Sequence, residues 1–503
     1  MSRALIASFA ALSLAAPLHQ TLLAQQKYVV ETSNKSNAAL ALLPMSTASA
    51  DARMHAALGQ RALDMGHARD AEKHFREAVA ADPTSAFAQL GIANSAASFA
   101  DYDASLSAAA KLAPNASRAE QLEISIAQKT LVSDFAGAEV LAKALIAEAP
   151  KNPRAYLALA TVQQQMGKET DARVTIKRAL GVAPNFSPAH LQLAFSYMVS
   201  QPTDPARAKP YIDRLVALEP KEPQAFLAQG SYYRAMNQLP LARRAYTRAA
   251  QLEPDESLPL QQRGHVESFL GNYEAARADY DAAIKLGKQN EAGNYRVVRA
   301  LVAAHAGNPK QSVAELDQLV GEIDGMNLPD PVGTKIGALN AEVLIATQIG
   351  EFESASRAIA QRTPLVREQV AKAADEKVKQ LVEADIAYYD GLLAARKGDA
   401  ETAKAKAGDI MRIVAGTNDP QKDQPAHAIL GVLALEQKDY ADAETHFAQA
   451  NPNDMYVVYE RALALEGAGR RAEAKALFRK IARFNFNAAS VAVVRADAVK
   501  RSR

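Results

Sequence analysis

Residues 153–186 read PRAYLALATVQQQMGKETDARVTIKRALGVAPNF, and this stretch of 34 residues decides the fold. Its second half places Ala172, Ile176 and Ala179 four and three residues apart, and Pro184 follows five residues later. Steps of four and three keep side chains on one face of an α-helix, and a proline ends a helix because it lacks a backbone N–H donor. The first half holds another apolar run with helical periodicity. The stretch therefore predicts two amphipathic helices joined by a turn.

The same pattern recurs along the chain. Prolines follow one another at spacings of 36, 34, 36 and 34 residues, at Pro114, Pro150, Pro184, Pro220 and Pro254. The apolar triplet of the second helix is repeated at Ala71, Phe75 and Ala78; Ala138, Ala142 and Leu145; Ala208, Ile212 and Leu215; Ala242, Tyr246 and Ala249; Ala276, Tyr280 and Ala283; Ala443, Phe447 and Ala450; and Ala474, Phe478 and Ile481. A repeat of this length indicates a solenoid of helical hairpins.

Two further positions of the repeat carry structural information. A small residue recurs twelve positions before the second-helix triplet, which predicts a close helix crossing there: Gly59, Ala160, Gly230, Gly264, Gly391 and Gly431. A residue suited to positive φ recurs at the turn that closes the first helix: Gly66, Gly167, Asn237, Gly271, Gly307, Gly350, Gly398 and Gly469. Asn272, Asp399 and Asp439 are predicted to be N-caps of second helices.

With these motifs the sequence resembles tetratricopeptide repeat proteins, over residues 52–486. The resemblance implies an all-α fold, a right-handed α-α superhelix (solenoid) whose first helices line a concave groove. We expect about twelve helix-turn-helix units, starting near residues 52, 85, 119, 153, 187, 223, 257, 293, 336, 384, 424 and 455.

The chain outside the clearest repeats divides into further segments. We expect an N-terminal repeat array at 52–320, a C-terminal array at 384–486 and a basic C-terminal tail at 487–503. Between the arrays, residues 321–334 are rich in helix breakers and predict a loop or hinge, within a segment 321–383 of loop plus connecting helix. The run from Leu365 to Lys397 is compatible with one long helix or with two diverged repeats, and the sequence leaves both open.

The N-terminus has the form of a signal peptide. After Arg3, thirteen apolar or small residues run from Ala4 to Ala16, and a cleavage point follows at Ala24, so residues 1–24 are interpreted as a signal peptide and 25–51 as a polar leader. The run is too short to cross a bilayer, so the protein is not expected to be transmembrane. We expect an exported, periplasmic protein of a Gram-negative bacterium; the alternatives are a frayed N-terminal helix and a cytoplasmic location.

Composition excludes several kinds of chemistry. The 58 basic and 56 acidic residues give a net charge of +2, which offers no bulk attraction for nucleic acid. The absence of Cys excludes disulfides, thiolate metal sites and a lipid-modified Cys. No nucleotide-binding or hydrolase motif is present, so we expect no catalytic residue, no cofactor and no metal site. The nearest histidine cluster in sequence, His67, Glu72 and His74, is interpreted as surface residues.

Function is therefore expected on the groove. By resemblance, the groove-facing polar residues are Arg154, Thr161, Gln164, Gln165, Gln224, Ser231, Arg234, Gln261, His265 and Ser268. They offer hydrogen bonds to a peptide, although a solvated helix face has the same composition. The sequence predicts a non-catalytic scaffold that binds a protein or peptide partner. The alternative is a structural component of a cell-envelope secretion or polysaccharide-export assembly, with self-association or membership of an envelope complex.

Overall fold

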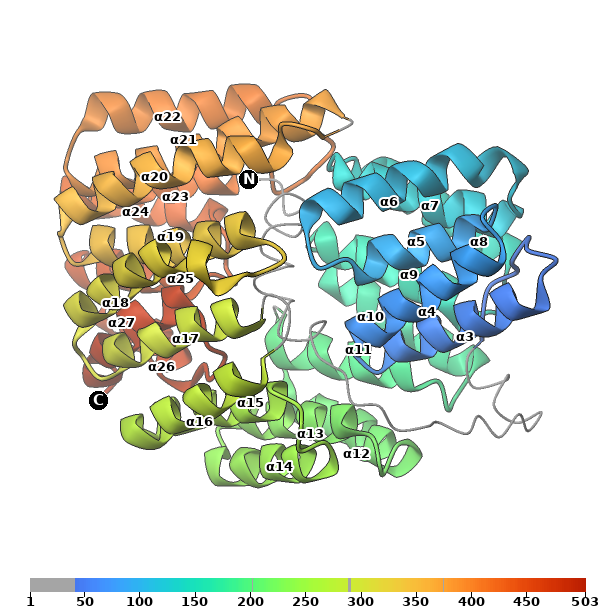
Figure 1. Ribbon diagram of the computed structural model, residues 1–503. Helices are drawn as coiled ribbons and strands as arrows, with labels where there is room; N and C mark the ends of the chain where they lie inside the picture. The colour runs from blue at the N-terminus through green and yellow to red at the C-terminus, as the bar shows by residue number, and fades with distance from the viewer. Residues whose placement is uncertain (1–40, 201, 288–290, 374) are drawn as a thin grey trace. The chain divides into compact units, whose positions relative to one another are not determined.

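The computed structural model describes residues 41–200, 202–287, 291–373 and 375–503. The predicted signal peptide and residues 25–40 of the predicted leader lie outside the described residues. Throughout these ranges the regular secondary structure is helical, without strands. The expected all-α class is confirmed (Figure 1).

The helices of the described ranges form twelve hairpins followed by one helix. The hairpins are α3 (Ala50–Asp64) with α4 (Ala68–Ala81), α5 (Ala86–Ser95) with α6 (Phe99–Leu112), α7 (Arg118–Leu131) with α8 (Phe135–Glu148), α9 (Pro153–Gln165) with α10 (Glu169–Val182), α11 (Ser187–Val199) with α12 (Lys209–Leu218), α13 (Pro223–Ala235) with α14 (Leu239–Leu252), α15 (Leu258–Leu270) with α16 (Tyr273–Leu286), α17 (Glu291–His305) with α18 (Pro309–Glu322), α19 (Pro331–Gln348) with α20 (Phe352–Val370), α21 (Glu376–Arg396) with α22 (Ala400–Val414), α23 (Gln424–Glu436) with α24 (Tyr440–Gln449), and α25 (Met455–Gly467) with α26 (Arg471–Arg483); α27 (Ala489–Arg501) follows.

The turns inside the hairpins follow the predicted backbone geometry. Positive φ occurs at all eight predicted positions, from 56° at Asn237 to 84° at Gly307, and Ser133 and Lys438 adopt it in two other hairpins. The side chains of Asp399 and Asp439 accept the expected capping hydrogen bonds from the backbone N–H groups of Thr402 and Asp442. Asn272 is an exception: it occupies the N-cap position, but its side chain makes no capping hydrogen bond.

The close crossings inside the hairpins involve an aromatic ring over a glycine. A Cβ added to Gly230 would lie 2.3 Å from the ring of Tyr246, and one added to Gly431 would lie 2.7 Å from Phe447. Contacts this short are not available to a side chain, so glycine lets the second-helix aromatic residue reach the first-helix backbone. The predicted close approach is confirmed at these positions.

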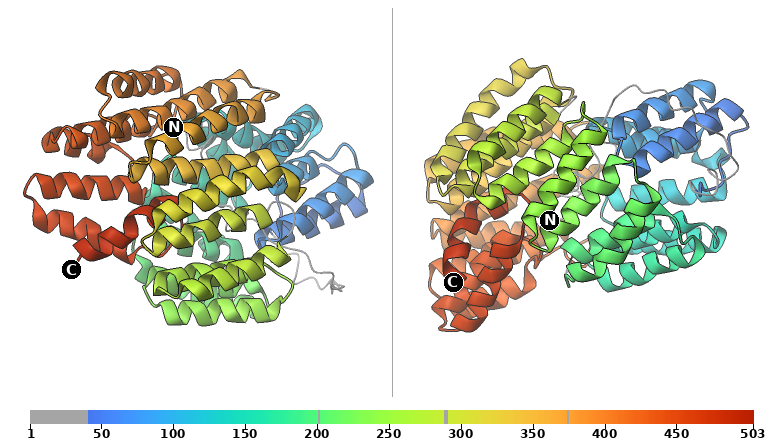
Figure 2. Two further views of the ribbon diagram at one scale, coloured as in Figure 1. Left: turned by 60° about the vertical axis from the view of Figure 1, so that its left-hand side comes forward. Right: turned by 90° about the horizontal axis from the view of Figure 1, so that it is seen from below.

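The described residues fall into two compact units. The N-terminal unit comprises residues 41–232 and 244–259, and the C-terminal unit comprises residues 233–243 and 260–503. Within the C-terminal unit, hairpins α17–α18 and α19–α20 lie side by side, as the yellow-green and yellow helices of Figure 2 show. α27 packs there against α17, α19 and α25.

The segment expected to connect two arrays is largely helical. The breaker-rich residues form a short 3-10 helix, η3 (Ile323–Met326), and Asp330 caps α19 by accepting a hydrogen bond from Gly333 N–H. Residues 365–397 are divided between α20 and α21, with a break that includes residues 371–373, so they do not form one continuous helix. Residues 487–503 contain the whole of α27. This helix is packed, because its Val491, Ala492, Val494 and Ala498 are buried.

Candidate functional site

In the N-terminal unit, two arginines of first helices are committed to ion pairs. Arg154 on α9 lies with a guanidinium nitrogen 3.0 Å from Asp64 Oδ1 on α3, and both side chains are largely buried. Arg61 on α3 pairs with Glu219, with 2.9 Å between Nη2 and Oε2. These pairs join residues 90 and 158 positions apart in the chain. Arg154 therefore contributes to the packing of this unit.

The other predicted residues of α9 form a polar surface with α11. Gln192 Nε2 donates hydrogen bonds to Thr161 Oγ1, at 3.1 Å, and to Gln164 Oε1, at 2.9 Å. Thr161 is exposed, whereas Gln164, Gln165 and Gln192 are half-buried. Gln165 Oε1 is buried and accepts no hydrogen bond from any described residue. We call Thr161, Gln164, Gln165 and Gln192 the α9–α11 polar surface.

Two predicted residues on α13 lie inside the N-terminal unit. Gln224 and Ser231 are buried, and Ser231 Oγ lies 3.2 Å from the hydroxyl of Tyr246 on α14. A hydroxyl pair of this kind stabilises the hairpin and leaves little of either group available to a partner.

Residues 42–46, which have no regular secondary structure, lie against first helices of the N-terminal unit. Leu42 O accepts a hydrogen bond from Asn152 Nδ2 at 3.0 Å, and Pro44 O accepts one from Ser117 Oγ at 2.8 Å. The backbone N–H of Ser46 donates to Glu120 Oε2 at 2.9 Å. Asn152 and Ser117 are the N-caps of α9 and α7, so polar groups at the starts of the first helices bind a peptide backbone.

In the C-terminal unit, the four predicted residues are buried. They are Arg234, Gln261, His265 and Ser268. Ser268 Oγ donates to Gly264 O of its own helix at 2.9 Å, and Gln261 Oε1 accepts from Gln262 at 3.0 Å. Arg234 and His265 instead contact the segment between α26 and α27, which we call the 484–488 segment.

Asn485 of the 484–488 segment is fully buried against the end of α13. Its backbone oxygen accepts a hydrogen bond from Arg234 Nε at 2.7 Å, and its Nδ2 donates to Arg234 O at 3.0 Å and to Asn237 Oδ1 at 2.9 Å. Its Oδ1 accepts from Arg495 Nη2 on α27 at 2.9 Å. The surrounding residues thus bind both the backbone oxygen and the side-chain amide of Asn485.

Asn487 is held between two histidines of first helices. Its Nδ2 lies 3.0 Å from His265 Nδ1 on α15, and its Oδ1 lies 2.8 Å from His305 Nε2 on α17. The hydroxyl of Tyr280 also lies 2.6 Å from His265 Nδ1. An amide N–H₂ donates and an amide oxygen accepts, so the arrangement assigns an accepting Nδ1 to His265 and a donating Nε2 to His305.

Burial keeps both histidines neutral. Burial, with smaller contributions from Arg234 and His305, lowers the pKa of His265 well below its usual range. Burial lowers the pKa of His305 to about 4, and the charge of Arg495 acts in the same direction while the hydrogen bond to Asn487 opposes it. Neutral imidazoles match the single donor and single acceptor that the asparagine contacts require.

Aromatic rings and arginines complete this site. The guanidinium carbon of Arg234 lies 4.8 Å from the ring centroid of Phe486, and that of Arg495 lies 4.8 Å from Phe269. The rings of Phe484 and Phe486 are 5.6 Å apart. Cation–π contacts are strongest when the groups are shielded from water, as they are at the buried Arg234.

Sequence reasoning did not identify Asn485, Asn487 or His305. The available signal was FNFN at 484–487, an aromatic and amide motif that follows the last second helix and fits no repeat position. That the ten predicted groove residues bind a separate partner stays a prediction.

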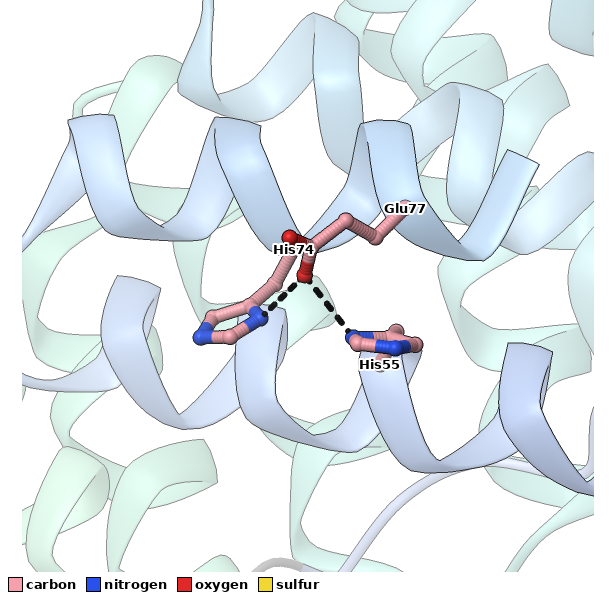
Figure 3. A group of neighbouring side chains, drawn as sticks. All are labelled: His55, His74 and Glu77. Atoms are coloured by element: carbon pink, nitrogen blue, oxygen red, sulfur yellow. Dashed lines mark hydrogen bonds and ion pairs between the residues drawn. The ribbon is translucent and has the colours of Figure 1, made fainter. Parts of the chain in front are cut away.

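The histidines of the first hairpin have different neighbours in the structure from those that the sequence suggested. His67 Nε2 lies 3.9 Å from Glu222 Oε2, and Glu72 pairs with Arg76. His74 lies beside Glu77 of its own helix and His55 of α3 (Figure 3). Sequence proximity grouped His74 with His67 and Glu72, whereas packing of the two helices groups it with His55 and Glu77.

Comparisons with known proteins identify the repeats. Family profiles described as "Tetratricopeptide repeat" match residues 131–197, 203–257 and 262–326. These segments therefore contain tetratricopeptide repeats. A stretch of 141 residues is 28% identical to human protein O-mannosyl-transferase TMTC1 and covers 27% of this chain but only 16% of the human protein.

Two solved structures align with parts of the chain. A tetratricopeptide repeat protein from Parabacteroides merdae aligns with a TM-score of 0.33 at 13% identity, over 57% of this chain and 96% of that chain. PilW, a type IV pilus biogenesis factor, aligns with a TM-score of 0.34 at 16% identity, over 42% of this chain and 95% of its own. Among the helices that the structure describes, none has both the length and the apolar character to cross a bilayer.

Proposed function

We propose that this chain, which contains tetratricopeptide repeats, is a non-catalytic scaffold that binds an extended segment of a partner protein on the faces of its first helices. The observation that carries the proposal is the 484–488 segment, because first-helix residues already bind an extended peptide there. Repeat proteins bind through extended preformed surfaces, so the scaffold loses little conformational entropy when a partner docks.

The contacts inside the chain support a specific mode of recognition. In both units, a segment without regular secondary structure is bound partly through its backbone: Leu42 O and Pro44 O in the N-terminal unit, and Asn485 O in the C-terminal unit. Backbone contacts give affinity without sequence preference, and the amide contacts of Asn485 and Asn487 add selectivity. The partner class we propose is therefore an extended peptide that carries amide side chains.

The α9–α11 polar surface is the proposed place for a separate partner. Thr161 is exposed there, and the buried Gln165 Oε1 accepts no hydrogen bond from a described residue. A buried acceptor without a donor costs about 1–3 kcal/mol, which a partner's N–H group would recover. By contrast, Arg154, Arg234 and His265 are largely buried as well as bonded to partners within the chain.

The test is partner capture by a surface variant. A Thr161→Ala, Gln164→Ala and Gln192→Ala triple variant of the full chain should lose most capture of its native partner while its melting temperature stays within a few degrees of wild type. A Val174→Ala variant, changed at an exposed residue of α10, is the matched control and should capture normally. Equal capture by wild type and the triple variant would exclude this surface.

Export to the periplasm of a bacterium is proposed on the N-terminal sequence alone. The run Ala4–Ala16 and the small residue Ala24 support it. N-terminal sequencing of the protein from its native host should give a chain that begins just after Ala24, and a mature protein that retains Met1 would contradict export by this route.

A further inference from the structure

We propose that His55, His74 and Glu77, in hairpin α3–α4, form a binding site for a divalent transition-metal ion of the Zn²⁺ class. The three side chains come from the two helices of one hairpin and converge on one point (Figure 3). The site shares no residue with the α9–α11 polar surface or with the contacts of the 484–488 segment.

The donor atoms are already gathered. His55 Nδ1 lies 2.9 Å from Glu77 Oε2, and His74 Nδ1 lies 3.0 Å from the same oxygen. All three donor atoms lie within 4.8 Å of one another. Among the described residues, no other group of three or more His, Cys, Asp or Glu side chains meets this condition.

Helix packing explains why the two imidazoles meet. Gly59 lies four residues after His55, and Phe75 directly follows His74. A Cβ on Gly59 would lie 3.0 Å from the Phe75 ring, so the two helices approach closely at this point. The approach places the neighbouring positions 55 and 74 face to face, with ring centroids 5.8 Å apart and planes 29° apart.

Two of the three donor separations suit tetrahedral coordination after a small adjustment, and the third is within 4.8 Å. Zn²⁺ binds imidazole nitrogen and carboxylate oxygen at about 2.0–2.2 Å, so neighbouring ligand atoms in a tetrahedron lie about 3.3–3.5 Å apart. The observed separations of 2.9 and 3.0 Å need to widen by only a few tenths of an ångström. The side chains of His55, His74 and Glu77 are 25%, 28% and 38% exposed, which leaves room for this movement and for a water as fourth ligand.

Hydrogen bonding alone does not account for the arrangement. His74 Nδ1 makes a hydrogen bond with Glu77 Oε2, whereas His55 Nδ1 is buried and makes none with any described residue, although it is 2.9 Å from the same oxygen. A buried imidazole nitrogen without a hydrogen bond carries a desolvation cost. A metal ion coordinated by that lone pair removes the cost. Two imidazoles with one carboxylate are a ligand set that suits Zn²⁺.

The chain contains a second histidine pair at the same repeat position. His427 and His446 are 19 residues apart, as are His55 and His74, and Gly431 and Phe447 provide the same close crossing. Their Nδ1 atoms lie 3.0 Å apart. Gln449, however, occupies the position equivalent to Glu77. This hairpin therefore presents two of the three ligands and serves as an internal control.

The experiment is a titration of the full chain with Zn²⁺, followed by calorimetry, and with Co²⁺, followed by visible absorption. Wild type should bind one ion per chain and should give the visible bands of tetrahedral Co²⁺. Glu77→Gln, which preserves side-chain volume, should weaken binding by roughly tenfold or more. The His55→Ala and His74→Ala double variant should lose the bands.

The control variant is His427→Ala with His446→Ala, which should bind the ion as wild type does. Melting curves recorded in the presence of a chelator identify variants that fail to fold. If a variant fails to fold, the titration is done with His55→Gln instead. Zn²⁺ should raise the melting temperature of wild type but not that of Glu77→Gln. Wild-type affinity in the His55 and His74 variants, loss of binding in the control, or only millimolar binding by wild type would each overturn the proposal.

Discussion

Asn485 and Arg234, which are 251 residues apart in the chain, exchange reciprocal hydrogen bonds: Arg234 Nε donates to Asn485 O, and Asn485 Nδ2 donates to Arg234 O. The pair fixes the 484–488 segment against the first helices of the C-terminal unit. An element that follows the second helix α26 thus contacts residues that the family resemblance assigns to a partner-binding groove.

Replacing Asn485 and Asn487 together by Ala should release the 484–488 segment. Each substitution leaves buried donors or acceptors unpaired, at a cost of about 1–3 kcal/mol apiece. Hydrogen exchange of residues 484–501 should accelerate, while the α9–α10 hairpin should exchange as before. A synthetic peptide of residues 482–503 should then bind the variant and not the wild type. Unchanged protection of 484–501 would contradict the assigned role of the two asparagines.

His305 should make the protein less stable in acid. Its pKa is 6.5 in the unfolded chain and about 4 in the fold, so between these values the unfolded state binds the proton and the folded state does not. The contribution of neutral His305 to the free energy of unfolding is complete above pH 6.5. It is lost as the pH falls towards 4, by about 2 kcal/mol between pH 7 and 5. Urea unfolding of wild type and His305→Gln should therefore give a free-energy difference that changes with pH. A free-energy difference between the two proteins that stays the same at every pH would contradict this role of His305.

Glu342 on α19 should change stability with pH in the opposite direction to His305, lowering it as the pH rises. It is fully buried, neither carboxyl oxygen has a hydrogen bond from a described residue, and burial followed by the charge of Asp317 raises its pKa to about 7. Between pH 4.5 and 7 the folded state keeps a proton that the unfolded state has released, so stability falls as the pH rises. Glu342→Gln should be more stable than wild type at pH 8, by about 1–3 kcal/mol, and should show less gain at pH 5. Chemical denaturation at the two pH values measures the difference, and an equal effect at both would contradict the protonation assignment.

The glycine crossings should be intolerant of a methyl group. In Gly230→Ala the new Cβ would meet Tyr246 at 2.3 Å, so we expect a loss of about 1–3 kcal/mol in the free energy of unfolding. Gly181 on α10 has nothing within 4 Å of an added Cβ, and Gly181→Ala should be neutral or stabilising by up to about 1 kcal/mol. Equal effects of the two changes would show that the crossing does not require glycine.

The repeat itself could be predicted from sequence because it is local. The helical triplets, the glycine turns and the aromatic contacts at Gly230 and Gly431 depend on residues within one hairpin. The contents of the first-helix faces could not be predicted, because Asn485 and Arg234 meet only through packing across the C-terminal unit. His55 and His74 lie within one hairpin, at the crossing predicted at Gly59, but sequence proximity grouped His74 with His67 and Glu72 instead.

The central claim, that first-helix faces bind the partner, is tested most directly by site-specific photo-cross-linking of the full chain in its native host. A photoreactive amino acid at Thr161 on α9 should give a discrete partner adduct, and the same amino acid at Val174, exposed on α10, should give none. Identical adducts at both positions, or an adduct at Val174 alone, would contradict binding through the first helices.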